Sequence, residues 1–471
     1  MINSRKQIFL NHFEKLAPIY TKYKRRYSYY WNDIISYINY FLTENQSVLD
    51  VGCGTGDTLS KLIGNQKVGI DFSSKMIEQA KINYPEIDFK LMDAENISLN
   101  QKFDVIVLSN VIGYFENIQD ILNSLKNVCK PNTRIIFTYY NLFWEPILKF
   151  GEFIGIKKKS PRQNWLSAKD IKNLLYLADF DTYRISRRML LPINIPVLSF
   201  IINKIIGKLP FINSLSLNYF VFARPIIEKK QDLSTTVVIP VRNESGNIEN
   251  AILRMPNFGK HLEIIFIEGN STDDTWSKIQ EVSQKYQHKF DIKIAKQDGK
   301  GKGDAVRKAY EMATGDILMI LDADLTVPPE ELPKFYDALI SGKAEFINGS
   351  RLVYPMDKNA MRPLNIFGNK FFSLAFSWIL EQEIKDTLCG TKVMYRSDYQ
   401  RLAKNRKFFG EFDPFGDFDL IFGAYKLNLK IIDLPITYKE RIYGDTNISR
   451  FKHGFILFKM MFFAIWKIKF W

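Results

Sequence analysis

Two stretches of the chain alternate short apolar runs with segments in which apolar residues recur every three or four positions. In the first stretch, the predicted strands are Ser47–Val51, Lys67–Asp71, Phe89–Asp93, Phe103–Ser109 and Arg134–Tyr139, and the predicted helices are Ser73–Asn83 and Ile118–Cys129. Alternation of this kind predicts parallel strands that are covered by helices.

The second stretch repeats this alternation. Its predicted strands are Thr235–Val241, Leu262–Glu268, Asp291–Lys296, Asp316–Leu321 and Ala344–Asn348, and its predicted helices are Asn247–Arg254, Asp273–Gln287, Asp304–Ala313 and Pro329–Ser341. Between the two stretches, Asn141–Ala223 is apolar and less regular, and the short charged segment Arg224–Leu233 follows it. We therefore predict two α/β domains, residues 1–228 and 233–471.

Composition narrows the class of protein. The 471 residues are 46% hydrophobic and 25% charged, as in ordinary globular domains, and the net charge of +14 favours anionic partners. Cys53, Cys129 and Cys389 are far apart, which predicts neither a disulfide framework nor a zinc site. The N-terminus lacks the apolar stretch of a signal peptide. The sequence contains no uninterrupted run of 18 apolar residues, so we do not expect a membrane-spanning helix. We expect a protein of the reducing cytoplasm.

A glycine-rich turn follows the first predicted strand, in the sequence VLDVGCGTG. Gly52, Gly54 and Gly56 have the spacing G-x-G-x-G, which differs from the G-x-G-x-x-G of loops that cradle a pyrophosphate. Asp50 precedes them and would repel a pyrophosphate but attract an ammonium group. The loop therefore predicts a ligand with a cationic amino group.

Polar residues also end the next three strands. Asp71 could accept hydrogen bonds from two ribose hydroxyls, and Asp93 could accept one from an adenine amino group. Ser109 ends the fourth strand, beside the cleft in which open α/β sheets bind ligands. A nucleotide-binding fold without catalysis is the alternative interpretation.

Residues 10–224 resemble class I S-adenosylmethionine-dependent methyltransferases, on the segments VLDVGCGTG, VGIDFS, LMDAENI and FDVIVLSNVIGYF. The resemblance implies a Rossmann-like sheet with S-adenosylmethionine as cofactor. It implies that Asp50, Gly52, Gly54 and Gly56 hold the methionine end, Asp71 the ribose and Asp93 the adenine, and that Ser109 and Tyr20 line the site. The sequence offers no evident general base, because methyl transfer mainly needs the donor and the acceptor to be aligned.

The second stretch carries two carboxylates at the end of a strongly apolar strand, in MILDADL. Asp322 and Asp324 are costly to bury unpaired and are natural ligands for Mg²⁺ or Mn²⁺. Such a metal could bridge the phosphates of a nucleoside diphosphate. Lys300 and Lys302 lie in a flexible glycine-rich turn directly before a helix, which also favours phosphate. A polar turn that merely ends a strand is the alternative.

Residues 233–460 resemble family 2 glycosyltransferases, most closely the polyprenyl-phosphate sugar transferases such as dolichol-phosphate mannose synthase. The matching segments are VVIPVRNE, IEGNSTDDTW, DGKGKGDAVRKAY, LDADL, INGSR, DTLCGTKVMYR, GDFDL and ERIYGDTNISRFKHG. The resemblance implies a GT-A-type sheet that binds a nucleoside-diphosphate sugar. It implies that Pro240, Glu244 and Glu268 surround the nucleoside, that Lys300 and Lys302 bind the nucleotide sugar, and that Asp322 and Asp324 hold the metal and the diphosphate. The chain has Glu268-Gly269 where family members often have two aspartates, which leaves the donor base open.

The same resemblance implies an inverting transfer, for which two acceptors stay open. If the acceptor is a glycan hydroxyl, Asp417 or Asp419 is the expected general base. If it is a polyprenyl phosphate, that group is already ionised and needs positioning by arginine, for which Arg351, Arg362 and Arg441 are the candidates.

A helix predicted over Phe451–Phe470 carries Lys452, Lys459 and Lys467 on one face and aromatic residues over much of the rest. Such a helix suits a membrane surface, and the apolar segments Ile195–Ile206 and Phe367–Leu380 favour peripheral association at the inner face of the membrane. A helix that packs on its own domain is the alternative.

We therefore expect a bifunctional transferase that acts on a lipid-linked or other cell-envelope glycan. Two alternatives remain at the level of sequence. In one, the N-terminal half binds S-adenosylmethionine without catalysis beside an active glycosyltransferase. In the other, the chain methylates nucleic acid, which it would bind through the basic residues Lys157–Lys159 and Arg162 and the aromatic Trp165. That alternative would leave the second domain without a role.

Overall fold

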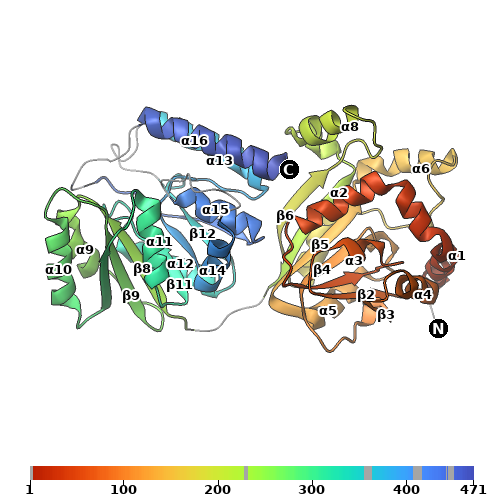
Figure 1. The fold of residues 1–471 in the computed structure, drawn as a ribbon, viewed down its shortest axis with the longest axis horizontal. Coiled ribbons are helices and arrows are strands. Elements are labelled where there is room, and N and C mark those ends of the chain that lie inside the picture. Colours follow the sequence, from red (N-terminus) through yellow and green to blue (C-terminus); the bar gives the residue numbers. More distant parts are fainter. Residues whose placement is uncertain are drawn as a thin grey trace. The chain divides into compact units, whose positions relative to one another are not determined.

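A computed structural model describes residues 4–226, 232–354, 363–406, 416–441, 443 and 450–470. The chain forms two compact units that divide between residues 227 and 228. Each unit is built around its own seven-stranded sheet (Figure 1).

Unit 1 contains a mixed sheet with the strand order β3-β2-β1-β4-β5-β7-β6. The strands are β1 (Ser47–Val51), β2 (Gln66–Asp71), β3 (Asp88–Leu91), β4 (Phe103–Ser109), β5 (Cys129–Tyr140), β6 (Phe180–Arg188) and β7 (Asn218–Pro225). β1 to β5 pair in parallel, and β7 is antiparallel to both β5 and β6. The parallel strands all end at one edge of the sheet, where the predicted ligand residues follow them.

The helices of unit 1 begin with two that the sequence interpretation did not predict, α1 and α2. The α-helices are α1 (Ser4–Arg26), α2 (Ser28–Asn39), α3 (Asp57–Lys61), α4 (Ser74–Asn83), α5 (Ile118–Leu125), α6 (Glu145–Phe153), α7 (Ala168–Leu177) and α8 (Leu198–Phe200). Each of α4, α5 and α7 begins at a polar residue whose side chain accepts a hydrogen bond from a backbone N–H of the first turn.

Unit 2 also contains a mixed sheet, with the order β10-β9-β8-β11-β13-β12-β14. The strands are β8 (Thr235–Val241), β9 (Leu262–Glu268), β10 (Asp291–Lys296), β11 (Ile317–Ile320), β12 (Phe346–Ser350), β13 (Lys392–Tyr395) and β14 (Ile431–Pro435). β13 is antiparallel to β11 and β12, whereas the other pairs are parallel. The inner strands β8, β9, β11, β12 and β13 are buried almost throughout, which is why they read as continuous apolar runs.

The helices of unit 2 are α9 (Ile248–Leu253), α10 (Thr275–Tyr286), α11 (Lys302–Met312), α12 (Leu332–Ile340), α13 (Pro363–Leu380), α14 (Arg396–Lys404), α15 (Asp417–Lys426) and α16 (Arg450–Ala464). A short π-helix, Ile465–Lys469, continues α16, so the predicted C-terminal helix is present. α13 and α16 lie against each other through aromatic contacts, such as Phe372 with Phe458 at 5.2 Å (Figure 1).

The predicted fold class, a Rossmann-like sheet followed by a GT-A-type sheet, is confirmed in both units. The main difference lies in residues 141–223, which seemed irregular. They supply β6 and β7, whose antiparallel pairing closes the sheet of unit 1 on the far side of β5. β7 is buried along its whole length, and β6 buries Arg184, Ser186 and Arg188 beside Phe180 and Tyr183, so neither strand shows a strict alternation of apolar and polar residues.

Candidate active sites

Unit 1 has a cavity at the carboxyl ends of its parallel strands, beneath α1. Seven of the eight predicted cofactor residues line it: Tyr20, Asp50, Gly52, Gly54, Asp71, Asp93 and Ser109. The eighth, Gly56, belongs to the same loop. Its φ is 79°, and a Cβ there would lie 2.6 Å from the Phe89 ring, so the turn requires glycine.

Asp50 is the most unusual group of this cavity. Its side chain is only 1% exposed, and its Oδ1 has no hydrogen-bond partner among the residues that the structure describes. Burial raises the pKa of Asp50 to about 7, and the nearby ammonium of Lys24 only partly opposes this. A cationic group that entered the cavity would therefore be attracted to Asp50 and would keep it ionised.

Asp71 fixes the glycine loop. One oxygen accepts the N–H of Gly54 at 2.9 Å, and the other accepts the N–H of Ser73 at 3.0 Å. The Tyr20 ring covers the loop so closely that a Cβ on Gly54 would lie 3.0 Å from it. Each carboxylate oxygen has further lone pairs, so Asp71 can still accept a ligand hydroxyl.

Asp93 and Ser109 lie at the same edge of the sheet and are already engaged. Asp93 forms an ion pair with Lys6 and accepts the N–H of Glu95 at 3.1 Å, and the Oγ of Ser109 lies 3.2 Å from the Oγ1 of Thr138. The roles of these two residues toward a cofactor stay predictions.

Two further residues, Lys24 and Asn110, also shape this cavity. Lys24 lines it, is buried, donates to the Oγ1 of Thr58 at 3.0 Å and lies 4.4 Å over the Trp31 ring. Asn110, at the end of β4, donates to the hydroxyl of Tyr30 at 2.7 Å. Asn110 has a φ of 57°, which is uncommon for a residue other than glycine. Only its place directly after Ser109 could have suggested it.

In unit 2, four charged residues that are far apart in sequence come together at the strand ends. The Nζ of Lys302 lies 2.6 Å from the Oδ1 of Asp322, and the Nζ of Lys392 lies 3.7 Å from the Oδ1 of Asp417. Burial alone would favour the neutral forms, but the contact raises the pKa of Lys302 and lowers that of Asp322. Gly390 permits this approach, since a Cβ there would lie 2.1 Å from the Oδ2 of Asp322.

Arg441 joins two further predicted donor residues. Its guanidinium lies 2.7 Å from the Oε1 of Glu244 and 2.7 Å from the Oδ2 of Asp324. Asp324 also accepts the hydroxyl of Thr326 at 2.8 Å. Glu244 and Asp324 follow β8 and β11, which are neighbours in the sheet, so the topology explains why they meet. The structure thus places Arg441 beside the predicted donor carboxylates.

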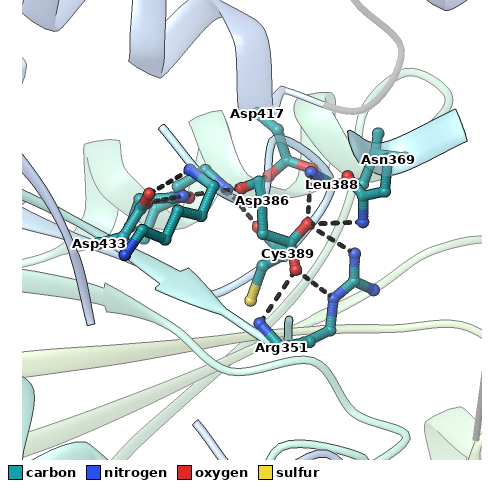
Figure 2. Close-up of polar contacts among 10 residues, drawn as sticks. Arg351, Asn369, Asp386, Leu388, Cys389, Asp417 and Asp433 are labelled. Atoms are coloured by element: carbon teal, nitrogen blue, oxygen red, sulfur yellow. Dashed lines mark hydrogen bonds and ion pairs between the residues drawn. The ribbon is translucent and has the colours of Figure 1, made fainter. Parts of the chain in front are cut away.

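Arg351 binds a buried partner that the sequence interpretation did not assign. Asp386 accepts from the Nε of Arg351 at 2.7 Å and from its Nη2 at 2.9 Å, and Asn369 donates to the same carboxylate at 3.0 Å (Figure 2). Burial opposes the charge of Asp386, yet Arg351 holds its pKa at about 2. Arg362, the other predicted acceptor residue on this stretch, lies outside the described residues.

The two candidate bases lie in different surroundings. The Oδ1 of Asp417 is buried and has no hydrogen-bond partner within the described part of the chain, whereas Asp419 lies 3.6 Å from Arg307 and 3.8 Å from Arg406. Of these two carboxylates, Asp417 is the one close enough to the Lys302–Asp322 pair for its charge to help raise the pKa of Lys302. The geometry favours Asp417.

The remaining predicted donor residues lie at the same edge of the sheet. Pro240 is half-buried in β8, Glu268 is buried at the end of β9 and accepts the N–H of Ser271, and Lys300 is exposed. Across the described ranges, no three His, Cys, Asp or Glu side chains form a metal-binding group. A metal at Asp322 and Asp324 would need oxygens from the donor.

Comparisons with known proteins agree with this division. The family described as "Methyltransferase domain" matches residues 42–181, and the family described as "Glycosyl transferase family 2" matches residues 236–408. The chain contains a methyltransferase domain and a family 2 glycosyltransferase domain. The two matches fall in the two units, and the glycosyltransferase match begins inside β8.

Similar curated proteins match only one domain each. A dolichol-phosphate mannosyltransferase of Pyrococcus furiosus is 37% identical over 26% of this chain and 34% of its own length. Glycosyltransferase AglJ of Haloferax volcanii is 28% identical over 47% of this chain and 69% of its own length. A malonyl-[acyl-carrier protein] O-methyltransferase of Acetivibrio thermocellus is 26% identical over 35% of this chain and 63% of its own length. The chain thus spans about a third of the length of the first of these relatives.

Among solved structures, a S-adenosylmethionine-dependent methyltransferase of Thermotoga maritima, described as a possible histamine N-methyltransferase, is similar. It covers 46% of this chain and 99% of its own, with 15% identity and a TM-score of 0.37.

Proposed function

We propose that the chain is a bifunctional transferase that methylates with S-adenosylmethionine and transfers a sugar from a nucleoside-diphosphate donor to a polyprenyl phosphate or a cell-envelope glycan. One observation supports this most: each unit gathers charged side chains at the carboxyl edge of its own sheet. In unit 1 they line a cavity, and in unit 2 they form the Lys302–Asp322 and Arg441–Asp324 clusters.

In the methyltransferase domain, Asp50 would bind the α-ammonium of S-adenosylmethionine and Asp71 its ribose, with Tyr20 covering the loop. S-adenosylmethionine held there would supply a methyl group for in-line transfer to an acceptor atom. The domain would contribute the alignment of donor and acceptor.

In the glycosyltransferase domain, Asp322, Asp324 and Lys302 would hold the diphosphate of the donor. Two carboxylates with diphosphate oxygens are a donor set that suits Mg²⁺ or Mn²⁺. A metal bound there would stabilise the departing nucleoside diphosphate. Glu244, Glu268 and Pro240 would surround the nucleoside.

Two groups of residues each suit a different sugar acceptor, a glycan hydroxyl or a polyprenyl phosphate. Asp417 would take the proton of a glycan hydroxyl as it attacks the anomeric carbon, with inversion. Arg351, Arg362 and Arg441 would instead position a polyprenyl phosphate. The ion pair of Arg351 with Asp386 favours the hydroxyl acceptor, and so does Asp417 Oδ1, which accepts no hydrogen bond from the described residues.

The association with a membrane would be peripheral. Within the described residues, every helix is too short or too polar to cross a bilayer. α13 and α16 present exposed aromatic side chains, among them Phe367, Phe455 and Trp466. We propose that these residues contact the inner face of the membrane.

The experiment that tests this function measures nucleoside diphosphate release from a panel of nucleotide sugars, with Mg²⁺ or Mn²⁺ and short polyprenyl phosphates or glycans. Wild type should release nucleotide with one donor, and Asp324→Ala should lose most of this release. Asp298→Ala, which removes an exposed carboxylate paired with Lys308, is the matched control. Equal release by wild type and Asp324→Ala would remove Asp324 from the site.

Methyl transfer has its own alternative, a domain that binds the cofactor without using it. Binding of S-adenosylhomocysteine without methylation of any glycan or lipid fraction would support that alternative.

A further inference from the structure

Helix α6 of unit 1 has an unusual surface for a short helix. Although four of its nine residues are Ile, Leu or Phe, none of the nine is buried. Ile147, Phe150 and Phe153 are exposed, Phe153 to 83%. Since helices of this length are held mainly by packing of an apolar face, this face lacks the apolar neighbour that usually covers it.

A second exposed apolar segment joins this helix. Residues 193–215 expose several large apolar side chains, including Val197 at 72% and Phe211 at 91%. Two hydrogen bonds tie the segment to the residues before α6: Trp144 Nε1 donates to the carbonyl of Leu215 at 2.8 Å, and Asn141 Nδ2 donates to that of Ser214 at 2.8 Å. We call these exposed residues of α6 and of 193–215 the α6–α8 surface (Figure 1).

The charges around the α6–α8 surface are mainly basic. Residues 154–169 contain five basic residues and no Asp or Glu, and residues 189–218 contain no Asp or Glu either. The two acids of α6 are each paired, Glu145 with Lys149 and Glu152 with Lys157, which leaves four of the five basic residues of 154–169 as net positive charge. Exposed phenylalanines with a net basic flank match an anionic lipid surface, in which aromatic rings enter the acyl boundary and lysines meet the headgroups.

A short segment connects the α6–α8 surface with the cavity. Lys157–Ser160 begin four residues after the last residue of α6 and line the same cavity as Asp50 and Asp71. This segment is held in place, because the hydroxyl of Tyr27 donates to the carbonyl of Ile156 at 2.6 Å and Arg5 donates to the side chain of Asn164 at 2.7 Å. A molecule anchored in the bilayer could therefore reach the cavity without leaving the lipid.

We infer that the methyltransferase domain docks on anionic membrane lipid through the α6–α8 surface, and that its methyl acceptor is a lipid-linked molecule whose polar head enters the cavity past Lys157–Ser160. The identity of the acceptor rests on the proposed methyl transfer, whereas the docking does not. This surface belongs to unit 1 and is distinct from the aromatic residues of α13 and α16.

The test uses the full chain and sedimentation with vesicles of phosphatidylcholine that contain about one third phosphatidylglycerol. The variant Phe150→Ser/Phe153→Ser/Phe211→Ser should bind these vesicles about tenfold more weakly than wild type. The control Ile82→Ser/Tyr176→Ser/Leu177→Ser removes three exposed apolar residues of the same unit away from this surface and should bind as wild type does. Both variants should bind S-adenosylhomocysteine with wild-type affinity in calorimetry.

Unchanged vesicle binding by the Phe150, Phe153 and Phe211 variant would overturn the inference. Sedimentation velocity that shows a wild-type dimer, lost in this variant, would assign the surface to a second copy of the chain and would also overturn it. Suppose that only the Phe150, Phe153 and Phe211 variant loses vesicle binding, but that neither wild type nor either variant binds S-adenosylhomocysteine. The docking would then stand and the proposed methyl transfer would fail.

Discussion

The two domains treat buried charge in opposite ways. In the methyltransferase domain, Asp50 keeps an oxygen without a partner, and no carboxylate of the described chain forms an ion pair with Lys24. In the glycosyltransferase domain, Asp322, Asp324 and Asp386 each contact a lysine or an arginine. An uncompensated buried charge costs free energy, whereas a paired one costs less. The first site is therefore poised for a ligand that brings its own charges, and the second must exchange internal partners for those of its substrate.

The largest effect should come from Asp417, the candidate general base of the glycosyltransferase domain. With a glycan hydroxyl as acceptor, Asp417→Asn should lower kcat about a hundredfold to ten-thousandfold, because it removes the general base. With a polyprenyl phosphate, which is already ionised, the loss should stay below about tenfold. Steady-state sugar transfer measures both. Asp419→Asn is the control, and a larger loss of transfer there than in Asp417→Asn would reverse the assignment.

Breaking the deepest ion pair should mainly affect stability. Arg351→Met leaves Asp386 buried without its cation, which should lower the free energy of unfolding of this domain by about 3–5 kcal/mol. Denaturant unfolding followed by circular dichroism measures it. The double variant Arg351→Met/Asp386→Leu should recover much of the loss, and an equally unstable double variant would contradict a charge-based explanation.

Removing the charge of Asp50 in the methyltransferase domain should raise the free energy of unfolding rather than lower it. The folded-state pKa of Asp50, about 7, lies above its ordinary value of 3.8, so its ionisation destabilises the fold. Asp50→Asn should therefore stabilise the ligand-free protein by about 2–4 kcal/mol near pH 8. The gain should shrink as the pH falls from 7 and vanish near pH 4. Unfolding curves across pH measure it, and a gain that is independent of pH would contradict the assigned pKa.

The smallest expected effect is a difference between the two candidate sites in how ligand affinity depends on ionic strength. Arg441 is partly exposed, so salt should weaken its contacts with a polyprenyl phosphate and should lower the affinity for that acceptor about two- to threefold between low and high salt. Binding of S-adenosylhomocysteine in the enclosed cavity should change less. Calorimetric titrations at both ionic strengths measure the difference, and an equal loss at both sites would remove the contrast.

Much of the fold followed from local pattern. The bounds of β1, β4, β8 and β9 agree with the sequence, because buried parallel strands are continuous apolar runs between polar turns. The carboxylates after those strands were visible for the same reason. The bounds of the half-buried edge strand β10 agree as well. β7, α1 and α2 were not predicted, although the buried residues of α2 recur at helical spacing.

The pairing of side chains could not be read from the sequence. Lys24 lies on α1 with nothing in its neighbourhood to mark it, and it enters the site only because α1 packs over the glycine loop. Arg351 and Asp386 are separated by 35 positions, and they meet because Arg351 directly follows β12, Asp386 lies shortly before β13, and these two strands pair. Such contacts depend on register and topology, which motifs alone do not specify.

The most direct test of two independent transferase sites measures both half-reactions in the same preparations of wild type, Asp50→Asn and Asp324→Ala. The readouts are S-adenosylhomocysteine formation and nucleoside diphosphate release. We predict that Asp50→Asn loses only the first and Asp324→Ala only the second. Loss of both products in either variant, or of neither in both, would contradict the account.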